Sequence, residues 1–351
     1  MKKGRKWVFA VMLAGNIVLI CQSVSLAFSA QAAALVDAGS QTLLVGINED
    51  MRLPMASTTK IMTALVALEQ KAPTELCRIS KHAAEIEGSS VYLRAGACYT
   101  LEELLYGLLL RSGNDAATAI AECVAGSEES FVGLMNQKAE SMGLENTHFD
   151  NPTGLDGETH YTTALELAQI TAEALKNPFF RTVFGTEAYS VAQERGHESA
   201  LWQNKHRLLL SRSDVLGGKT GYTKASGRSL VTAANRGGLT LIAVTLNDPD
   251  DWKDHEALLD YGFSEFERVK LSDLIDPIEI PIAGGGRITA CVIENTAITL
   301  HRGETNQLSF FYRIPRFVYG EETALLHPIG TVSVQLKGAE IASLPMICWK
   351  K

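Results

Sequence analysis

Three short stretches of this chain combine residue types that can carry out acyl transfer on a serine. In order along the sequence they are Ser57-Thr-Thr-Lys60, Ser112-Gly-Asn114 and Lys219-Thr-Gly221. A serine hydroxyl is a weak nucleophile unless a base removes its proton, and a lysine can be that base only when burial or nearby positive charge lowers its pKa. Each stretch alone is common, since a chain of this length holds roughly one Ser-x-x-Lys by chance. Their combination predicts a single site of serine acyl transfer.

The first stretch is expected at the start of a helix over residues 57–69. Apolar residues recur there at offsets of three, four and seven, which indicates one buried helix face: Ile61, Ala64, Leu65 and Leu68. Residues three apart share a helix face, so Lys60 should lie beside the Ser57 hydroxyl. Lys219 is a candidate for the second positive charge that lowers the pKa of Lys60. The alternative makes Ser57 only an N-cap and Lys60 a solvated residue of the first turn.

The second stretch is expected in a tight loop between two helices. Thr100 and Glu103 form a capping box before a leucine-rich helix that should stop near Arg111. A second helix is expected from about residue 115. Residues two apart in a non-helical segment project the same way, so Ser112 and Asn114 should face one cleft. Alternatively, Ser-Gly-Asn is only a common turn and helix-start sequence.

The third stretch is expected in an edge strand of a sheet. Residues 215–222 are rich in glycine, and strand-like segments follow at residues 229–234 and 239–246 with a turn between them, which predicts an antiparallel meander. Residues 34–36 and 42–45 read as two further strands. Glycines at such density in an edge strand suggest that a ligand or another backbone approaches closely. The alternative is a bulged edge strand with a solvated lysine.

The first residues have the layout of a secretory signal. Four basic residues precede an apolar run over residues 7–20, and small residues follow, with cleavage expected after Ala32. The alternative is an uncleaved membrane anchor, because apolar character persists to Leu26 and approaches the length of a bilayer-spanning helix. The signal is therefore placed at residues 1–32, and the protein is expected outside the cytoplasm.

The remaining composition is that of a globular protein with two domains. Charged residues make up 21% and hydrophobic residues 46% of the chain, and without the four basic residues of the signal 28 basic residues face 40 acidic ones. No basic patch indicates nucleic acid. The histidines are scattered without a His-Glu-x-x-His, and the cysteines lack a Cys-x-x-Cys, so neither a metal site nor a cofactor is expected. A bridge among Cys77, Cys98 and Cys123 and buried free thiols are both open.

Longer blocks around the three stretches resemble the serine-type D-alanyl-D-alanine carboxypeptidases, the low-molecular-mass penicillin-binding proteins. The resemblance covers nearly the whole mature chain. It implies an α/β (α+β) fold in which a five-stranded antiparallel sheet with helices faces an all-helical subdomain, here over residues 33–266. The blocks that carry it are Pro54-Met-Ala-Ser-Thr-Thr-Lys60, Leu108-Leu-Leu-Arg-Ser-Gly-Asn-Asp-Ala-Ala117, Phe149-Asp-Asn-Pro-Thr-Gly-Leu155, His160-Tyr-Thr-Thr-Ala164 and Gly218-Lys-Thr-Gly-Tyr-Thr223.

The resemblance implies three catalytic residues. Ser57 attacks the carbonyl of the penultimate D-alanine of a peptidoglycan stem peptide, and Lys60 takes its proton. Ser112 relays a proton to the leaving amine. A histidine near a cleft could be a general base, but for His160 we expect a structural hydrogen-bonding role, because Lys60 already supplies the base.

The resemblance also implies the substrate-binding residues. Asn114 holds the substrate backbone and the Lys60 amine, while Lys219 and Thr220 receive the terminal carboxylate. The oxyanion hole maps to the backbone N–H groups of Ser57 and Tyr222. Gly221 lets that backbone come close.

Residues 267–351 are expected to form a small all-β domain, a sandwich or a barrel, similar to the C-terminal β-domain of the same family. Short β-prone segments separated by glycines and prolines lie at residues 278–282, 287–293, 297–300, 308–314 and 331–336. Many family members end on an amphipathic helix in the membrane surface, but residues 346–351 are too few for one. Attachment by that route is therefore not expected, and association with a membrane surface by other means stays open.

We expect an enzyme that removes the terminal D-alanine of stem pentapeptides and binds β-lactam antibiotics covalently. Three alternatives are a class A-like β-lactamase, a peptidoglycan DD-endopeptidase and a non-catalytic β-lactam-binding wall protein. The first is disfavoured because no Glu-x-x-Leu-Asn occurs, and the last because the three stretches are intact. The sequence does not indicate the oligomeric state.

Overall fold

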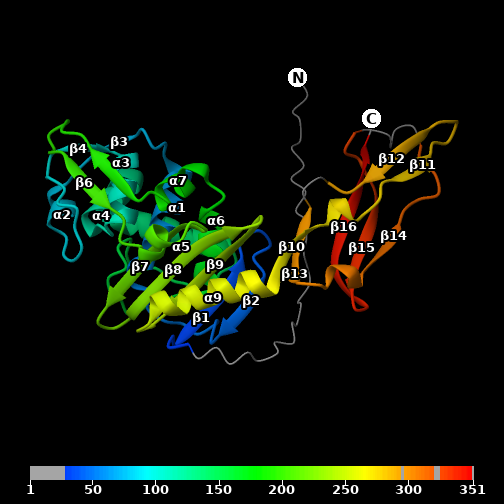
Figure 1. The fold of residues 1–351 in the computed structure, drawn as a ribbon. Coiled ribbons are helices and arrows are strands. Elements are labelled where there is room, and N and C mark those ends of the chain that lie inside the picture. The colour runs from blue at the N-terminus through cyan, green and yellow to red at the C-terminus, as the bar shows by residue number, and fades with distance from the viewer. Residues whose placement is uncertain (1–27, 294–295, 320–324, 350–351) are drawn as a thin grey trace, which may run out of the picture. The chain divides into compact units, whose positions relative to one another are not determined.

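The computed structural model describes residues 28–293, 296–319 and 325–349, and Figure 1 shows the course of the chain. The described chain divides into two compact units, one up to Phe263 and the other from Ser264 onward. Each unit has its own buried apolar cluster. The two are described separately below.

The first unit is built on a five-stranded sheet in which every strand pair is antiparallel. The order is β2-β1-β9-β8-β7, so β7 is an edge strand, as its glycines predicted. β9 lies in the middle and is buried along nearly its whole length, which explains its almost continuous apolar sequence. The strands are β1 (Ala32–Asp37), β2 (Leu43–Ile47), β7 (Val215–Thr223), β8 (Gly227–Arg236) and β9 (Leu239–Leu246).

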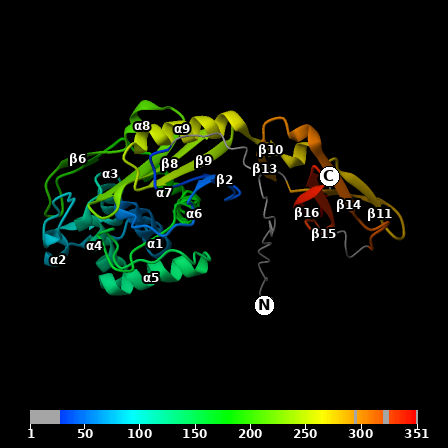
Figure 2. The same cartoon turned by 90° about the horizontal axis from the view of Figure 1, so that it is seen from below.

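Helices cover both faces of this sheet. On one face lies α9 (Asp251–Glu265), where His255 bonds Thr245 of β9 across 3.1 Å. On the other face α6 (Ala164–Ala174) packs against β1 and β9, and α1 (Lys60–Gln70) packs on α6 (Figure 2). The sheet and helices predicted for this part of the chain are confirmed.

Further helices form the helical region of the unit around α1. Those that contact α1 are α3 (Leu101–Leu110), α4 (Asn114–Ala125), α5 (Glu128–Ser141) and α7 (Pro178–Phe184), and α2 (Lys81–Glu85) packs on α4. The short α8 (Arg207–Ser211) packs against β7. Two short strand pairs, which the sequence did not predict, lie among them: β3 (Leu76–Arg78) with β4 (Cys98–Thr100), and β5 (Ala188–Val191) with β6 (Ala200–Gln203).

The predicted capping box begins α3. The Thr100 hydroxyl accepts from the N–H of Glu103, and the Glu103 carboxylate accepts from the N–H of Thr100. The helix ends at Leu110 with Arg111 as its C-cap, as predicted. The loop that carries Ser112 therefore starts from a well-defined helix end.

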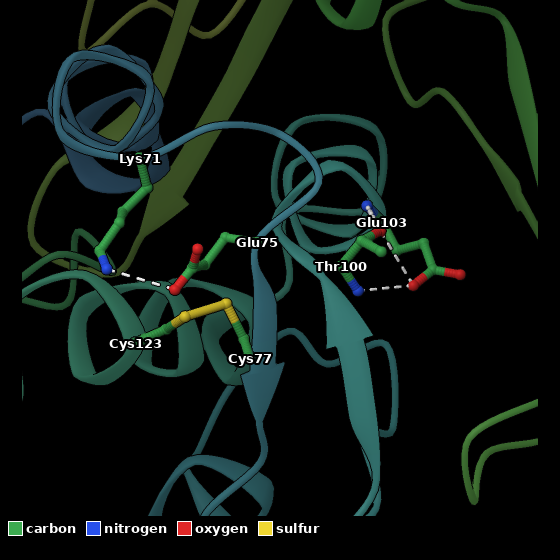
Figure 3. The surroundings of a disulfide bond; sticks show 6 residues. All are labelled: Lys71, Glu75, Cys77, Thr100, Glu103 and Cys123. Carbon is green, nitrogen blue, oxygen red and sulfur yellow. Dashed lines mark hydrogen bonds and ion pairs between the residues drawn. A yellow bond between two sulfur atoms is a disulfide. The ribbon is translucent and has the colours of Figure 1, made fainter.

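A disulfide joins Cys77 of β3 to Cys123 of α4 (Figure 3). The alternative of free thiols is therefore wrong for these two residues, whereas Cys98 carries a free thiol. Figure 3 also shows the ion pair of Lys71 with Glu75, 3.2 Å long, in the segment that connects α1 to β3. The disulfide ties this connection to α4, whose first turn contributes to the site described below.

The second unit consists of two sheets around one apolar cluster, in agreement with the predicted β-domain. The larger sheet has the antiparallel order β11-β12-β16-β15-β14, and β10 pairs with β13. The sequence did not predict β10 and β16. Residues 346–349, from the final segment that is too short for an amphipathic helix, lie in β16. The strands are β10 (Phe266–Lys270), β11 (Ile278–Pro281), β12 (Arg287–Cys291), β13 (Ala297–His301), β14 (Leu308–Arg313), β15 (Pro328–Leu336) and β16 (Ala339–Trp349), with short 3₁₀ turns at Leu271–Asp273 and Thr305–Gln307.

Among the described residues, no helix combines the length and the apolar character needed to cross a bilayer. Most of the predicted signal, residues 1–27, lies outside the described part of the chain. Residues 28–32 are described, and Ala32 is already the first residue of β1.

Candidate active site

Ser57 lies in a 3₁₀ turn, Ala56–Thr59, that leads directly into α1. The helix begins at Lys60 and not at Ser57 as predicted, because the hydroxyls of Thr58 and Thr59 bind the carbonyls of Met55 and Ala56 and tighten the turn. The three-residue spacing still brings Lys60 Nζ to 3.1 Å from Ser57 Oγ. The predicted Ser–Lys pair therefore exists.

Lys60 is fully buried, so the alternative of a solvated first-turn lysine is wrong. Its ammonium nitrogen donates to Asn114 Oδ1 at 2.8 Å and to the carbonyl of Thr153. Burial lowers the pKa of Lys60 to about 7, Asp115 opposes this shift and Lys205 adds to it. Burial is thus the main cause of the low pKa of Lys60. The nearby cation that lowers this pKa further is Lys205, whereas the sequence analysis expected Lys219 in that role.

The carbonyl of Thr153 is presented to Lys60 by a turn around Asn151. Asn151 Oδ1 accepts from the N–H groups of Thr153, Gly154 and Leu155 at 2.8–3.2 Å. Gly154 has φ +83°, and a Cβ there would lie 2.0 Å from the carbonyl oxygen of Ala56. The turn therefore packs its backbone directly against the residue that precedes Ser57, and only glycine fits.

Ser112 is buried and has φ 63°, a left-handed conformation that costs a non-glycine residue free energy. Its Oγ accepts from Lys219 Nζ at 2.9 Å, and the same nitrogen donates to the carbonyl of Thr220 at 2.7 Å. Burial, followed by the charges of Lys60 and Lys205, lowers the pKa of Lys219 well below its usual value. Two lysines and two serines therefore share one site.

Asn114 is the first residue of α4, one position earlier than predicted. Its amide nitrogen donates to the carbonyl of Glu87 at 2.7 Å, and its backbone N–H donates to the carbonyl of Ser89 at 2.6 Å. Since its side-chain oxygen accepts from Lys60, the amide orientation is set from both ends.

Asp115 holds the neighbouring segment, residues 89–93, against the site. It is completely buried and accepts from the Ser90 hydroxyl and from the N–H groups of Val91 and Leu93 at 2.6–3.1 Å. Sequence reasoning missed this residue. Its only signal was an acidic side chain in the first turn of a predicted helix, which usually indicates no more than a favourable interaction with the helix dipole.

The remaining predicted residues follow one another on β7. A Cβ on Gly221 would lie 3.0 Å from the carbonyl oxygen of Met55 and 3.2 Å from the backbone nitrogen of Ser57, so the close backbone approach predicted from the glycine-rich strand is present. Thr220 is half-buried, and Tyr222 exposes 67% of its surface. All the predicted site residues thus lie on three neighbouring segments.

His160 is buried, and both of its ring nitrogens have partners. Nδ1 accepts from the N–H of Asp150 at 2.9 Å, which leaves Nε2 to donate to Thr59 Oγ1 at 2.8 Å. Burial lowers its pKa to about 4, so the ring is neutral. These contacts favour the structural role, since His160 braces the 3₁₀ turn that carries Ser57.

Within the described chain, no group of three metal-ligating side chains is placed to hold an ion.

The fold and the serine–lysine site together define the penicillin-binding class of serine enzymes. The sequence matches the family described as D-alanyl-D-alanine carboxypeptidase over residues 21–250. The chain belongs to this family of serine peptidases.

Individual relatives agree with this assignment. The chain is 37% identical to the D-alanyl-D-alanine carboxypeptidase DacF of Bacillus subtilis over 69% of its own length, but it spans only 64% of that relative. It is 32% identical to DacC of Escherichia coli over 91% of its length and 83% of the relative. The crystal structure of penicillin-binding protein 5 from Haemophilus influenzae superposes with a TM-score of 0.77 at 27% identity, covering 92% of this chain and 97% of that one.

Proposed function

We propose that this protein is an exported serine DD-carboxypeptidase that removes the terminal D-alanine from peptidoglycan stem pentapeptides. The observation that carries the proposal is the buried Lys60 amine, 3.1 Å from the Ser57 hydroxyl, with a pKa lowered to about 7. A lysine of ordinary pKa would be protonated at neutral pH and could not accept the serine proton. Burial keeps a substantial fraction of the Lys60 amine unprotonated at neutral pH.

Acylation begins when Ser57 Oγ attacks the carbonyl carbon of the penultimate D-alanine and Lys60 takes the hydroxyl proton. The carbonyl oxygen becomes an oxyanion, which the backbone N–H groups of Ser57 and Tyr222 are proposed to bind. The short approach of Gly221 to the Ser57 nitrogen supports this assignment. Loss of one such donor typically lowers the rate about 100- to 1000-fold.

The tetrahedral intermediate then expels D-alanine. Ser112 relays to the leaving amine the proton that Lys60 took from Ser57, and Lys219, whose Nζ lies 2.9 Å from the Ser112 hydroxyl oxygen, holds that hydroxyl in place. Lys219 and Thr220 receive the terminal carboxylate, and Asn114 holds the peptide backbone. Water finally hydrolyses the Ser57 ester, which releases the tetrapeptide and restores the hydroxyl.

A β-lactam should acylate Ser57 in the same way and stay bound. Its ring amide opens without losing a leaving group, so the acyl-enzyme persists until water attacks. The sequence holds no Glu-x-x-Leu-Asn, the motif whose glutamate activates the hydrolytic water in class A β-lactamases. This disfavours the β-lactamase alternative.

The proposal is tested by the release of D-alanine from a stem pentapeptide and by the mass of the protein after treatment with labelled penicillin. The wild type should release D-alanine and gain one penicillin mass, Ser57→Ala should do neither, and Ser141→Ala, on the exposed end of α5, should match the wild type. Wild-type protein that gains the mass without releasing D-alanine would be a non-catalytic wall protein. Cleavage of cross-linked muropeptides in preference to pentapeptide would identify an endopeptidase. Hydrolysis of many penicillin molecules per second would identify a β-lactamase.

The substrate also implies the location and the partners. Stem peptides lie outside the cytoplasmic membrane, so the proposed enzyme acts in the cell wall or at the outer face of the cytoplasmic membrane, consistent with the signal-like first residues. Its partners are stem peptides and, as covalent inhibitors, β-lactams.

A further inference from the structure

A buried hydrogen-bonded group that the proposed mechanism does not use lies behind β7, on the face of the sheet that α9 covers. It consists of His206 immediately before α8, Thr232 of β8 and His255 of α9, and their exposed fractions are 1%, 0% and 0%. The Thr232 hydroxyl oxygen lies 3.0 Å from His206 Nε2 and 2.8 Å from His255 Nδ1. His255 also bonds Thr245 of β9, so the group joins two strands of the sheet to α9.

The two ring nitrogens of His206 have different roles. Nδ1 accepts from the N–H of Leu209 at 3.2 Å and thereby caps α8. Nε2 therefore carries the hydrogen, and it donates toward the carbonyl oxygen of Val231, 3.2 Å away, and toward the Thr232 hydroxyl. Burial lowers the pKa of His206 to about 3, so the ring is neutral at neutral pH. One imidazole thus ties the start of α8 to β8.

The residues that His206 binds on β8 are the partners of the site-forming part of β7. Val231 is paired with Lys219, and Thr232 is paired with Gly218. A Cβ on Gly218 would lie 2.1 Å from His206 Nε2, so the imidazole packs directly on the backbone of β7 at the residue before Lys219. Side chains alternate between the two faces of a strand, so Lys219 points to the opposite face, toward the site.

The β7–β8 ladder is irregular just before Lys219. Its register shifts between Val215 and Gly217, where β7 contains one residue more than β8. Such a bulge leaves a residue unpaired and bends the strand locally. β7 is also an edge strand, so in the described sheet its strand contacts come from β8 alone. The contact of His206 with Gly218 therefore braces β7 where the regular ladder resumes.

We propose that His206 is a positioning residue that holds the β7–β8 pair at Gly218 and Lys219, and thereby keeps the Lys219 amine within hydrogen-bond reach of Ser112. This inference rests on the proposed function, which assigns Lys219 and Thr220 to the terminal carboxylate of the substrate. His206 is buried behind the strand, so it acts on the reaction only through β7. A misplacement of about 1 Å that originates far from the reacting bond can lower a rate about 100-fold.

Two amide substitutions separate the two bonds of His206. In His206→Asn the side-chain amide replaces Nδ1, so it can still accept from the Leu209 N–H but cannot reach Val231. In His206→Gln the longer side chain brings the amide nitrogen to the place of Nε2, so it can donate to Val231 but no longer caps α8. A role in capping alone predicts that asparagine is the better replacement, whereas a positioning role predicts that glutamine is.

The variants are compared by the second-order rate of acylation with labelled penicillin, by the release of D-alanine and by thermal unfolding. We expect both variants to fold. The acylation rate should fall about 10- to 100-fold in His206→Asn and stay within about threefold of the wild type in His206→Gln. His327→Asn, which alters an exposed histidine of the second unit, is the matched control and should acylate as the wild type does.

Three results would overturn the positioning role: a wild-type acylation rate in His206→Asn, an equal loss in both variants, or a loss in His206→Gln alone, which would assign His206 to capping only. Failure of the proposed function gives a different result. Wild-type protein that is acylated by penicillin but releases no D-alanine would contradict the carboxypeptidase, and the acylation rates of the two variants would still decide the role of His206. Wild-type protein that is not acylated at all would contradict both.

Discussion

Lys219 on β7 donates to Ser112, in the loop between α3 and α4, across 2.9 Å and 107 positions of sequence. This hydrogen bond joins the edge of the sheet to the helical region at the point where Lys60 and Ser57 also lie. Because both groups are buried, the position of each depends on the other. The site is therefore a product of the packing of β7 against the helices, and substitutions that disturb this packing should lower activity without touching Ser57.

The rate of acylation should fall as the pH drops below about 7. Neutral Lys60 is the reactive form, and its pKa of about 7 means that protonation removes it on the acid side. Lys205 lowers this pKa, so Lys205→Met should raise it and move the acid limb to higher pH. Labelling by penicillin at a series of pH values measures the midpoint. Lys176→Met on an exposed surface is the control, and a midpoint that stays in place in Lys205→Met contradicts the electrostatic role of Lys205.

Asp115→Asn should move the same acid limb in the opposite direction. The charge of Asp115 raises the pKa of Lys60, so a neutral side chain lowers it. The amide also places N–H donors where Asp115 now accepts from the hydroxyl of Ser90 and two backbone N–H groups, which should reduce the free energy of unfolding by about 1–3 kcal/mol. Thermal unfolding and the pH profile separate the two effects. A stable variant with an unshifted midpoint would show that Asp115 influences neither.

Gly154→Ala should be far more damaging than Gly143→Ala. Both glycines have positive φ, so alanine costs each about 1–2 kcal/mol through the left-handed backbone. A Cβ on Gly143 meets nothing within 4 Å, whereas one on Gly154 lies 2.0 Å from the carbonyl oxygen of Ala56. The clash must displace the turn that carries Ser57. We expect slower penicillin acylation only in Gly154→Ala, and equal acylation rates in the two folded variants would show that this contact does not position the serine.

Removing the disulfide should clearly lower the free energy of unfolding and only slightly lower the rate of penicillin acylation. Cys77 and Cys123 are 46 positions apart, and a bond that closes such a loop typically contributes about 2–4 kcal/mol. Cys77→Ala with Cys123→Ala should therefore lower the midpoint of thermal unfolding, as should reduction of the wild type. Cys98→Ala, which removes a free thiol, provides the matched control. A double variant as stable as Cys98→Ala would indicate that the bond contributes little.

Local patterns in the sequence were enough to predict much of the site and of the fold. A three-residue spacing places Lys60 beside Ser57 whether the turn is α or 3₁₀, since both geometries bring residues three apart together. The capping box of Thr100 and Glu103 and the meander of β7, β8 and β9 depend on neighbours along the chain. Such features are short-ranged, so a sequence pattern can predict them.

Other features depend on contacts between distant segments, which only the tertiary structure decided. The partner of Cys77, the hold of Asp115 on residues 89–93 and the approach of Gly154 to Ala56 follow from how helices and turns pack. The low pKa of Lys60 was predicted, but its main cause, complete burial, is a property of the packed core. The sequence by itself thus determined which groups could react. The packing decided their protonation and their distances, because burial and long-range contacts arise only when the chain folds.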